Sequence, residues 1–250
     1  MNKLQRQKRL VDIMQSKGIL PIKTLASMID VSEMTIRRDL KELQTQGNDF
    51  TVGISSSHSS SEYDLMQALE RANSQKERIG HFAASLIEPN DVICIDTGST
   101  TAKMLPHLAT NQNITVLCYN ANVLMSLLNQ KGIQLLFGGG VYHKNTEMFE
   151  SPEMIQFIRR TRINKSFLSA AGVEKALGVT CVNSYEVATK RAVIDSSQQR
   201  ILLVDSGKFD QVRPSYFCEL DDIQVIVSDT NLSQDWQQYI RSKGITLYLA

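Results

Sequence analysis

The feature that most constrains the fold is an alternation of short aliphatic runs with amphipathic segments, which begins near residue 90. Aliphatic runs of this kind are typical of strands buried on both faces. Helices between them predict a parallel sheet covered on both sides, whose sites lie beyond the carboxyl ends of the strands. The runs are VICID (92–96), ITVLCYN (114–120), IQLLFGG (133–139), SFLSAAGV (166–173), RILLVD (200–205), IQVIVSD (223–229) and ITLYLA (245–250), and the helical patterns include PEMIQFIRRTR (152–162) and SQDWQQYIRSK (233–243).

The first 47 residues have a different pattern, which predicts three short helices. Gly18 and Gly47 fit helix ends, Pro21 fits a first helical turn, and Ser32 fits the N-cap of the third helix. Asp30 and Val31 would form a tight connection before it. Apolar residues recur at helical spacing in each segment: Leu10, Ile13 and Met14; Ile22, Leu25, Ala26 and Ile29; Ile36, Leu40 and Leu43.

Two adjacent arginines lie in the third of these helices, within VSEMTIRRDL (31–40). A second helix, a tight turn and a third helix have the spacing of a helix-turn-helix. Arginine binds guanine or phosphate bidentately, and hydroxyls and a helix N-terminus also bind phosphate. The alternative is a solvated helix face with Arg–Asp and Lys–Glu pairs. The candidate DNA-binding residues are Ser32, Glu33, Met34, Thr35, Arg37, Arg38 and Lys41.

The distribution of charge favours the DNA-binding interpretation. The chain has 27 Lys or Arg and 26 Asp or Glu, so its formal net charge is only +1. Residues 1–47 hold nine of the basic and five of the acidic residues, which leaves 18 basic and 21 acidic residues in the remainder. A basic head on an acidic body is expected when one small domain binds a polyanion.

Six serines between residues 55 and 61 separate the two patterns. Such a segment cannot bury enough apolar surface to order itself, so it is either a linker or a loose wing. Residues 62–87 have a largely helical pattern, and its early part could pack against a partner subunit. We therefore expect a DNA-binding domain at 1–56, a linker and connecting helix at 57–75, and a sensor domain at 76–250.

A Gly-Ser-Thr turn follows the first aliphatic run, in DTGSTT (96–101), and a helical pattern follows the turn. Glycine permits close approach of the backbone, the hydroxyls donate hydrogen bonds, and a new helix supplies free N–H groups. This combination binds phosphate. The alternative is plain capping of the helix.

The N-terminal motifs resemble those of the DeoR family of bacterial regulators of sugar metabolism, whose recognition helix reads VSxxTIRRDL. The resemblance implies a winged helix-turn-helix joined to an α/β sensor domain similar to ribose-5-phosphate isomerase. It implies a transcriptional repressor of a sugar or deoxyribonucleoside catabolic operon, which a phosphorylated sugar releases from operator DNA. Where the family continues into a wing rich in Arg, His and paired Gly, this chain has NDFTVGISSSHSSS (48–61).

The sensor half is also similar to the family, with counterparts of its GDxGTT, paired-glycine, AAGV and VDxSKF segments. The resemblance implies phosphate binding by Lys208 and contacts of Glu186 and Lys190 with sugar hydroxyls, although a surface ion pair explains the latter two equally well. KFDQVRP (208–214) is similar to the branch that regulates deoxyribose catabolism, which implies deoxyribose 5-phosphate as effector. The candidate ligand-binding residues are Asp96, Gly98, Ser99, Thr100, Thr101, Asn120, Gly139, Gly172, Glu186, Lys190 and Lys208.

The resemblance to an isomerase fold raises the alternative of a sugar-phosphate isomerase fused to a DNA-binding head. The isomerases carry an acidic DGADE segment, and SAAGVEK (169–175) lacks its aspartates, so we expect binding without turnover and no catalytic residues. The four cysteines and four histidines are scattered, which predicts no metal or cofactor and a reduced, cytoplasmic protein. No apolar run is long enough to cross a membrane. A head this small predicts a homo-oligomer.

Overall fold

The computed structural model describes residues 3–17, 22–32, 34–36, 38–39, 65, 73–108 and 113–250. The chain divides into two compact units, Met1–Ser60 and Ser61–Ala250, and each has its own hydrophobic core. Much of what the sequence predicts between them lies outside the described residues, namely the end of the third helix, the wing, the serine-rich segment and most of 62–72.

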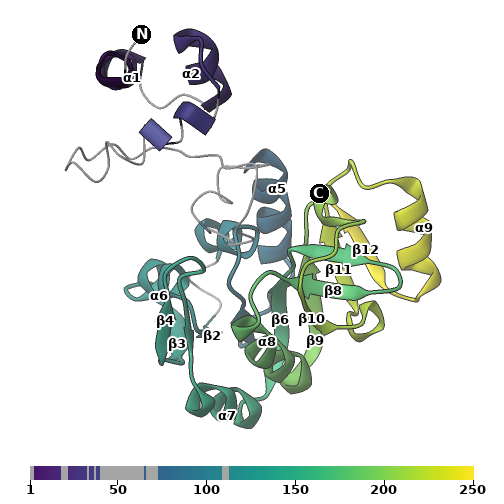
Figure 1. Cartoon of the computed structure of the whole chain (residues 1–250). Helices are drawn as coiled ribbons and strands as arrows, with labels where there is room; N and C mark the ends of the chain where they lie inside the picture. Colours follow the sequence, from purple (N-terminus) through teal and green to yellow (C-terminus); the bar gives the residue numbers. More distant parts are fainter. Residues whose placement is uncertain are drawn as a thin grey trace. The chain divides into compact units, whose positions relative to one another are not determined.

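The N-terminal unit contains α1 (Lys3–Lys17) and α2 (Ile22–Ile29), and further helical residues at 34–36 and 38–39 (Figure 1). Asp30 has a φ of 58°, and the amide of Val31 donates to Ala26 O at 3.1 Å, so the tight connection predicted after α2 is confirmed. The core of this unit, in which partly buried Ile13, Met28 and Val31 also pack, consists of Leu10, Leu25, Ala26, Ile29 and Ile36.

The C-terminal unit is built around a seven-stranded sheet within the described residues, and every strand pair in it is parallel. The predicted parallel sheet is therefore confirmed. From one edge to the other its strands are β12 (Thr246–Leu249), β11 (Val225–Ser228), β9 (Ser197–Leu203), β6 (Ile163–Ser169), β1 (Val92–Ile95), β2 (Ile114–Cys118) and β3 (Ile133–Phe137).

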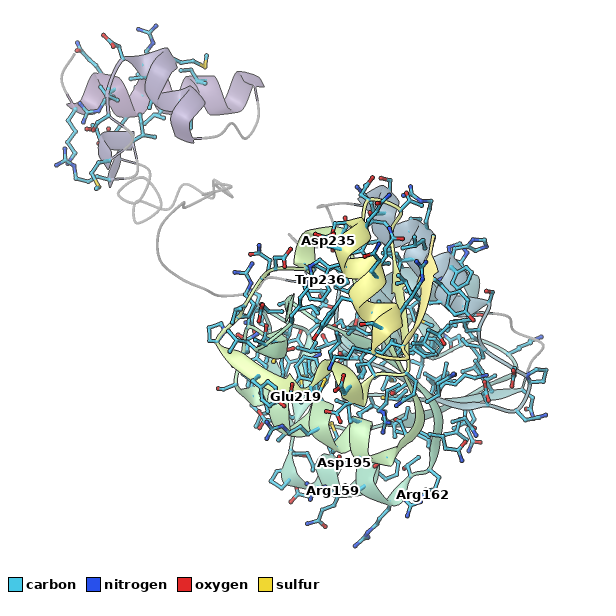
Figure 2. All side chains as sticks on the ribbon, turned by 90° about the vertical axis from the view of Figure 1, so that its right-hand side faces the viewer. Arg159, Arg162, Asp195, Glu219, Asp235 and Trp236 are labelled. Atoms are coloured by element: carbon cyan, nitrogen blue, oxygen red, sulfur yellow. The ribbon has the colours of Figure 1, made fainter. Side chains whose placement is uncertain are left out.

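Helices cover both faces of this sheet, as the continuous aliphatic strands predict (Figure 1). One face packs against α5 (Asn73–Ala84), the 3-10 helix η1 (Thr101–His107) and α6 (Ala121–Leu127). The other packs against α7 (Pro152–Arg160), α8 (Tyr185–Ser196) and α9 (Gln234–Ser242). Trp236 of α9, labelled in Figure 2, is buried there, and its Nε1 donates to Asp210 Oδ1 at 2.9 Å.

Several short strands outside the main sheet do not follow from the aliphatic pattern. The predicted run at 166–173 divides, because the chain leaves the main sheet after Ser169 and begins a different sheet at Gly172. That smaller sheet consists of β7 (Gly172–Glu174), β8 (Gly178–Cys181) and β10 (Ser215–Cys218). The two antiparallel strands β4 (Val141–His143) and β5 (Met148–Glu150) form a separate hairpin. Two further 3-10 helices are η2 (Ser206–Lys208) and η3 (Leu220–Asp222).

The four cysteines are buried, which confirms the prediction that they pack as small apolar side chains. No helix among the described residues is long and apolar enough to span a lipid bilayer.

Helix α5 lies unusually close to η1, the helix that follows the Gly-Ser-Thr loop. A Cβ atom added at Gly80 would lie 2.5 Å from the backbone carbonyl carbon of Lys103. Lys103 Nζ is also 3.0 Å from Glu77 Oε2 of α5. The two helices can approach this closely only because position 80 has no side chain.

We predict that Gly80→Ala lowers the free energy of unfolding by about 1–3 kcal/mol, because a methyl group would push η1 away from α5. In a helix without this contact, the same change stabilises by roughly 0.5–1 kcal/mol. Thermal or urea denaturation measures the difference, with Ser74→Ala at an exposed position of α5 as the control. A Gly80→Ala protein as stable as the wild type would contradict the close packing.

Candidate functional site

The helix that would read DNA begins at Ser32, and its described residues give the geometry of its first turn. Ser32 Oγ accepts from the amide of Thr35 at 3.2 Å and lies 2.9 Å from Thr35 Oγ1, so the predicted N-cap is confirmed. Met34 is 76% exposed and Arg38 is also exposed, as their helical positions predict. Glu33, Arg37 and Lys41 lie outside the described residues.

An ion pair fixes this helix to α1. Arg6 of α1 donates to both carboxylate oxygens of Asp39, from Nε to Oδ2 and from a terminal nitrogen to Oδ1 at 3.1 Å. The Asp39 side chain is fully buried. The Asp of RRDL is therefore not part of a solvated face, which was the alternative interpretation of this segment. It anchors the helix and leaves Arg38 beside it exposed.

In the C-terminal unit, the predicted phosphate-binding loop follows β1 and is organised by the buried carboxylate of Asp96. Oδ1 accepts from the Thr97 amide at 2.8 Å and from the Tyr119 hydroxyl at 2.6 Å. Oδ2 accepts from the Ser169 amide at 2.9 Å and from Lys190 Nζ. Asp96 thus joins β1, β2, β6 and α8 at the carboxyl ends of the strands.

Lys190 is the positive partner in this buried cluster. Its side chain is 1% exposed, it pairs with Asp96, and its Nζ lies 3.8 Å from Glu186 Oε2. Burial alone lowers the pKa of Lys190, but the charges of Asp96 and Glu186 outweigh burial and raise this pKa above its ordinary value. Burial also raises the pKa of Glu186. The surface ion pair considered for Glu186 and Lys190 is in fact a buried one.

A pocket of about 440 Å³ opens above this cluster, at the carboxyl edge of the sheet. The lining comes from the loop after β1, the segment after β6, the end of β8, α8 and η2: Thr97, Gly98, Ser99, Thr100, Ser169, Ala170, Ala171, Cys181, Val182, Glu186, Lys190 and Lys208.

Three backbone amides of the loop are free to bind an anion. The amides of Gly98, Ser99 and Thr100 donate to no acceptor among the described residues, and the first bond of the following turn is from Ala102 to Gly98 O. A Cβ atom at Gly98 would lie 2.6 Å from Ser169 Cβ, so this turn requires glycine. Lys208 lines the same pocket and forms no ion pair within the described part of the chain.

Six of the eleven candidate ligand-binding residues line the pocket, and the other five lie behind or beside it. Asp96 and Thr101 hold the loop from below, since Thr101 Oγ1 donates to Asp96 O and Gly98 O. Gly172 is required by packing, because a Cβ atom there would lie 2.4 Å from Gln211 O. Asn120 is buried outside the lining, and Gly139 also lies outside it.

Ser169 and Cys181 belong to the pocket but were not among the candidates. Ser169 Oγ donates to Thr97 O at 2.5 Å and to Asp96 Oδ2 at 3.2 Å, so it helps to shape the loop. The sequence holds no clear signal for it, because Ser169 lies inside the predicted run 166–173 and only the structure ends the strand there. Cys181 ends β8, a strand of the smaller sheet, whose placement over the pocket has no signature in the sequence. Within the described residues no three His, Cys, Asp or Glu side chains form a metal site.

The fold and the site together define a regulator with a helix-turn-helix head and a small-molecule sensor domain. Comparison with known families agrees, because the DeoR-like helix-turn-helix domain matches residues 6–49 and the DeoR C-terminal sensor domain matches residues 71–230. The chain therefore belongs to the DeoR family.

Relatives of this family match the chain over nearly its full length. The chain is 28% identical to the deoxyribose operon repressor of Escherichia coli strain K12, over 97% of this chain and 98% of that protein. It is 26% identical to the HTH-type transcriptional regulator IolR of Bacillus subtilis strain 168, over 99% and 100%. Among solved structures, ribose 5-phosphate isomerase from Plasmodium falciparum aligns with a TM-score of 0.40 at 16% identity, over 55% of this chain and 53% of that one.

We predict that Lys190→Met lowers the free energy of unfolding by about 3–5 kcal/mol, because it leaves the Asp96 carboxylate buried without a counter-charge. Adding Asp96→Asn should recover part of this loss. Lys243→Met is the matched control, since Lys243 pairs with Asp221 at the surface, where solvent screening keeps the contribution of an ion pair small. Equal losses for Lys190→Met and Lys243→Met in urea denaturation would show that the buried pair is not essential.

Proposed function

We propose that this protein is a transcriptional repressor of a sugar or deoxyribonucleoside catabolic operon, released from its operator by a phosphorylated sugar. The observation that carries the proposal is the set of amides at Gly98, Ser99 and Thr100. They donate to no acceptor among the described residues, and they share one pocket with Lys208, which has no ion-pair partner among those residues. Backbone N–H groups and a lysine are what a phosphate group needs. The names of the relatives, among them a deoxyribose operon repressor, support deoxyribose 5-phosphate as the first effector to test.

The sugar itself would lie over Glu186 and Lys190, which line the pocket beside the loop.

The buried side chain of Asn120 is an argument that the loop rearranges when the effector binds. Asn120 directly follows Tyr119, whose hydroxyl donates to Asp96 beneath the loop, and it forms a bridge with Met148 of β5. It is fully buried, and neither atom of its side-chain amide has a hydrogen-bond partner among the described residues. An unsatisfied buried amide costs about 1–3 kcal/mol per lost hydrogen bond, which the bound state can recover.

The alternative function, a sugar-phosphate isomerase, requires a carboxylate free to move a proton. Glu186 is the one carboxylate in the described pocket lining, and it is engaged. Its Oε1 accepts from the amide and the Nδ2 of Asn183 at 3.3 and 2.9 Å, and its Oε2 lies near Lys190. We therefore favour binding without turnover.

DNA recognition would use the exposed face of the helix that begins at Ser32, with Arg38 as its described cation. A head of this kind buries roughly 600–1,000 Å² on DNA, so we propose that a homo-oligomer binds the operator in the cytoplasm. The proposed boundaries are a DNA-binding domain at 1–56, a connecting segment at 57–75 and a sensor domain at 76–250. The compact units divide at Ser60 and Ser61.

We predict that Arg38→Ala weakens binding to the preferred DNA site by about 1–3 kcal/mol, the range for one bidentate base contact. The measurement is a titration at fixed salt against a duplex that the wild-type protein selects from a random pool. Arg9→Ala is the control, because Arg9 is also exposed in this unit but lies on α1. If both variants lose the same affinity for the selected and random duplexes, Arg38 contributes charge and does not read the sequence.

We predict that Lys208→Met lowers the affinity for deoxyribose 5-phosphate roughly 10- to 100-fold, since a hydrogen bond to a charged group contributes about 1.5–3 kcal/mol. Calorimetric titration measures this. NMR of the wild-type protein mixed with ribose 5-phosphate, which has the C2 hydroxyl that isomerisation requires, should show that sugar phosphate chemically unchanged. Lys131→Met, at an exposed lysine just before β3 and so at the opposite edge of the sheet, should bind like the wild type. Unaltered affinity in Lys208→Met would remove the phosphate site from this pocket, and isomerisation of ribose 5-phosphate would favour the enzyme.

A further inference from the structure

The turn of the β4–β5 hairpin, residues 144–147, contacts the effector loop. Thr97 of that loop is 2% exposed, and its Oγ1 donates to the backbone carbonyl of Thr146 at 2.7 Å. Thr146 is itself fully buried. Thr97 is a lining residue of the pocket, so a change in the loop on binding an anion acts directly on the hairpin turn.

Helix α8 contacts the same turn through its first residue, Tyr185. The Tyr185 hydroxyl donates to Asn145 Oδ1 at 2.8 Å and lies 3.1 Å from Thr146 Oγ1. Its ring stacks on His143, with centroids 3.6 Å apart and planes 6° apart, and His143 Nε2 lies 3.0 Å from Glu150 Oε2 across the hairpin. Tyr185 immediately precedes Glu186 of the pocket. The turn is therefore contacted by the loop after β1 through Thr97 and by α8 through Tyr185.

Leu65, within the expected connecting segment, also contacts the turn. The amide of Leu65 donates to Asn145 O at 2.8 Å, and Leu65 is 1% exposed. Leu65 belongs to the C-terminal unit and follows Ser60, the last residue of the N-terminal unit, by only five positions. Asn145 therefore receives a hydrogen bond from the pocket side through its side chain and one from the connecting segment through its backbone.

We propose that the turn 144–147 couples the effector pocket to the connecting segment, with Tyr185 as the positioning residue that holds Asn145 in place. The inference rests on the proposed function, because it needs a ligand that changes the loop. A ligand can shift a conformational equilibrium only through contacts that differ between the two states. Here the contacts that change are Thr97 to Thr146 and Tyr185 to Asn145, and their loss weakens the hold on Leu65.

The variant that tests this is Tyr185→Phe, which removes the hydroxyl and keeps the ring that stacks on His143. The matched control is Tyr216→Phe, whose hydroxyl donates to Glu219 Oε1 at 2.9 Å on the smaller sheet, away from the turn. The readout is hydrogen exchange of the Leu65 amide in the full chain, measured by NMR with leucine amides labelled. Inorganic phosphate and deoxyribose 5-phosphate are the probes, and a thermal-shift assay records separately whether each one binds.

Without ligand, the Leu65 amide should exchange roughly threefold to tenfold faster in Tyr185→Phe than in the wild type, and Tyr216→Phe should match the wild type. Binding of a probe should speed Leu65 exchange in the wild type and in Tyr216→Phe, and should change it little in Tyr185→Phe. Equal Leu65 exchange in Tyr185→Phe and the wild type would overturn the proposal. A probe that binds but leaves wild-type Leu65 exchange unchanged would overturn the coupling and leave the proposed function standing. If neither probe binds, the proposed function and the coupling fail together.

Discussion

The buried pair of Asp96 and Lys190 is the interaction on which the rest of the sensor domain depends. It joins the end of β1 to α8, and the remaining lone pairs of Asp96 hold the Thr97 amide, the Tyr119 hydroxyl and Ser169. A charge taken out of water is costly unless it is paired and hydrogen-bonded, and this carboxylate is both. The backbone is consequently held in place at Thr97, where the loop begins. Its free amides are held in place before any anion arrives, which lowers the entropic cost of binding.

The parallel sheet explains why so many separate segments meet at this point. All carboxyl ends lie on one edge, so residues that follow β1, β2, β6 and β9 come together although they are far apart in the chain. The same edge carries the hairpin turn and Leu65. The hairpin turn therefore contacts both Thr97 of the pocket lining and Leu65. Basic groups elsewhere, such as Arg159 and Arg162 near the end of α7 (Figure 2), do not line the pocket.

The sequence predicts the parts of this structure that depend on local pattern. The aliphatic runs give the strands of the main sheet, and Ser32 as N-cap follows from its position before a helical stripe. Packing that depends on distant residues is not readable in this way. Nothing local shows that Asp39 pairs with Arg6, or that Lys190 is buried against Asp96. The β4–β5 hairpin was missed because its strands are only three residues long and each ends in a charged or polar residue, His143 and Glu150. Gly172 and Thr101 belong to the family pattern of binding residues, yet they do not line the pocket. Sequence similarity does not distinguish residues that bind the ligand from residues that shape the pocket.

The most direct test of this account is a crystal structure of the full chain with deoxyribose 5-phosphate bound. The account predicts that the phosphate group accepts hydrogen bonds from the amides of Gly98, Ser99 and Thr100 and from Lys208 Nζ, while Lys190 stays paired with Asp96 beneath the sugar. A phosphate group bound anywhere else, or a Lys190 that leaves Asp96 to bind the phosphate itself, would contradict it.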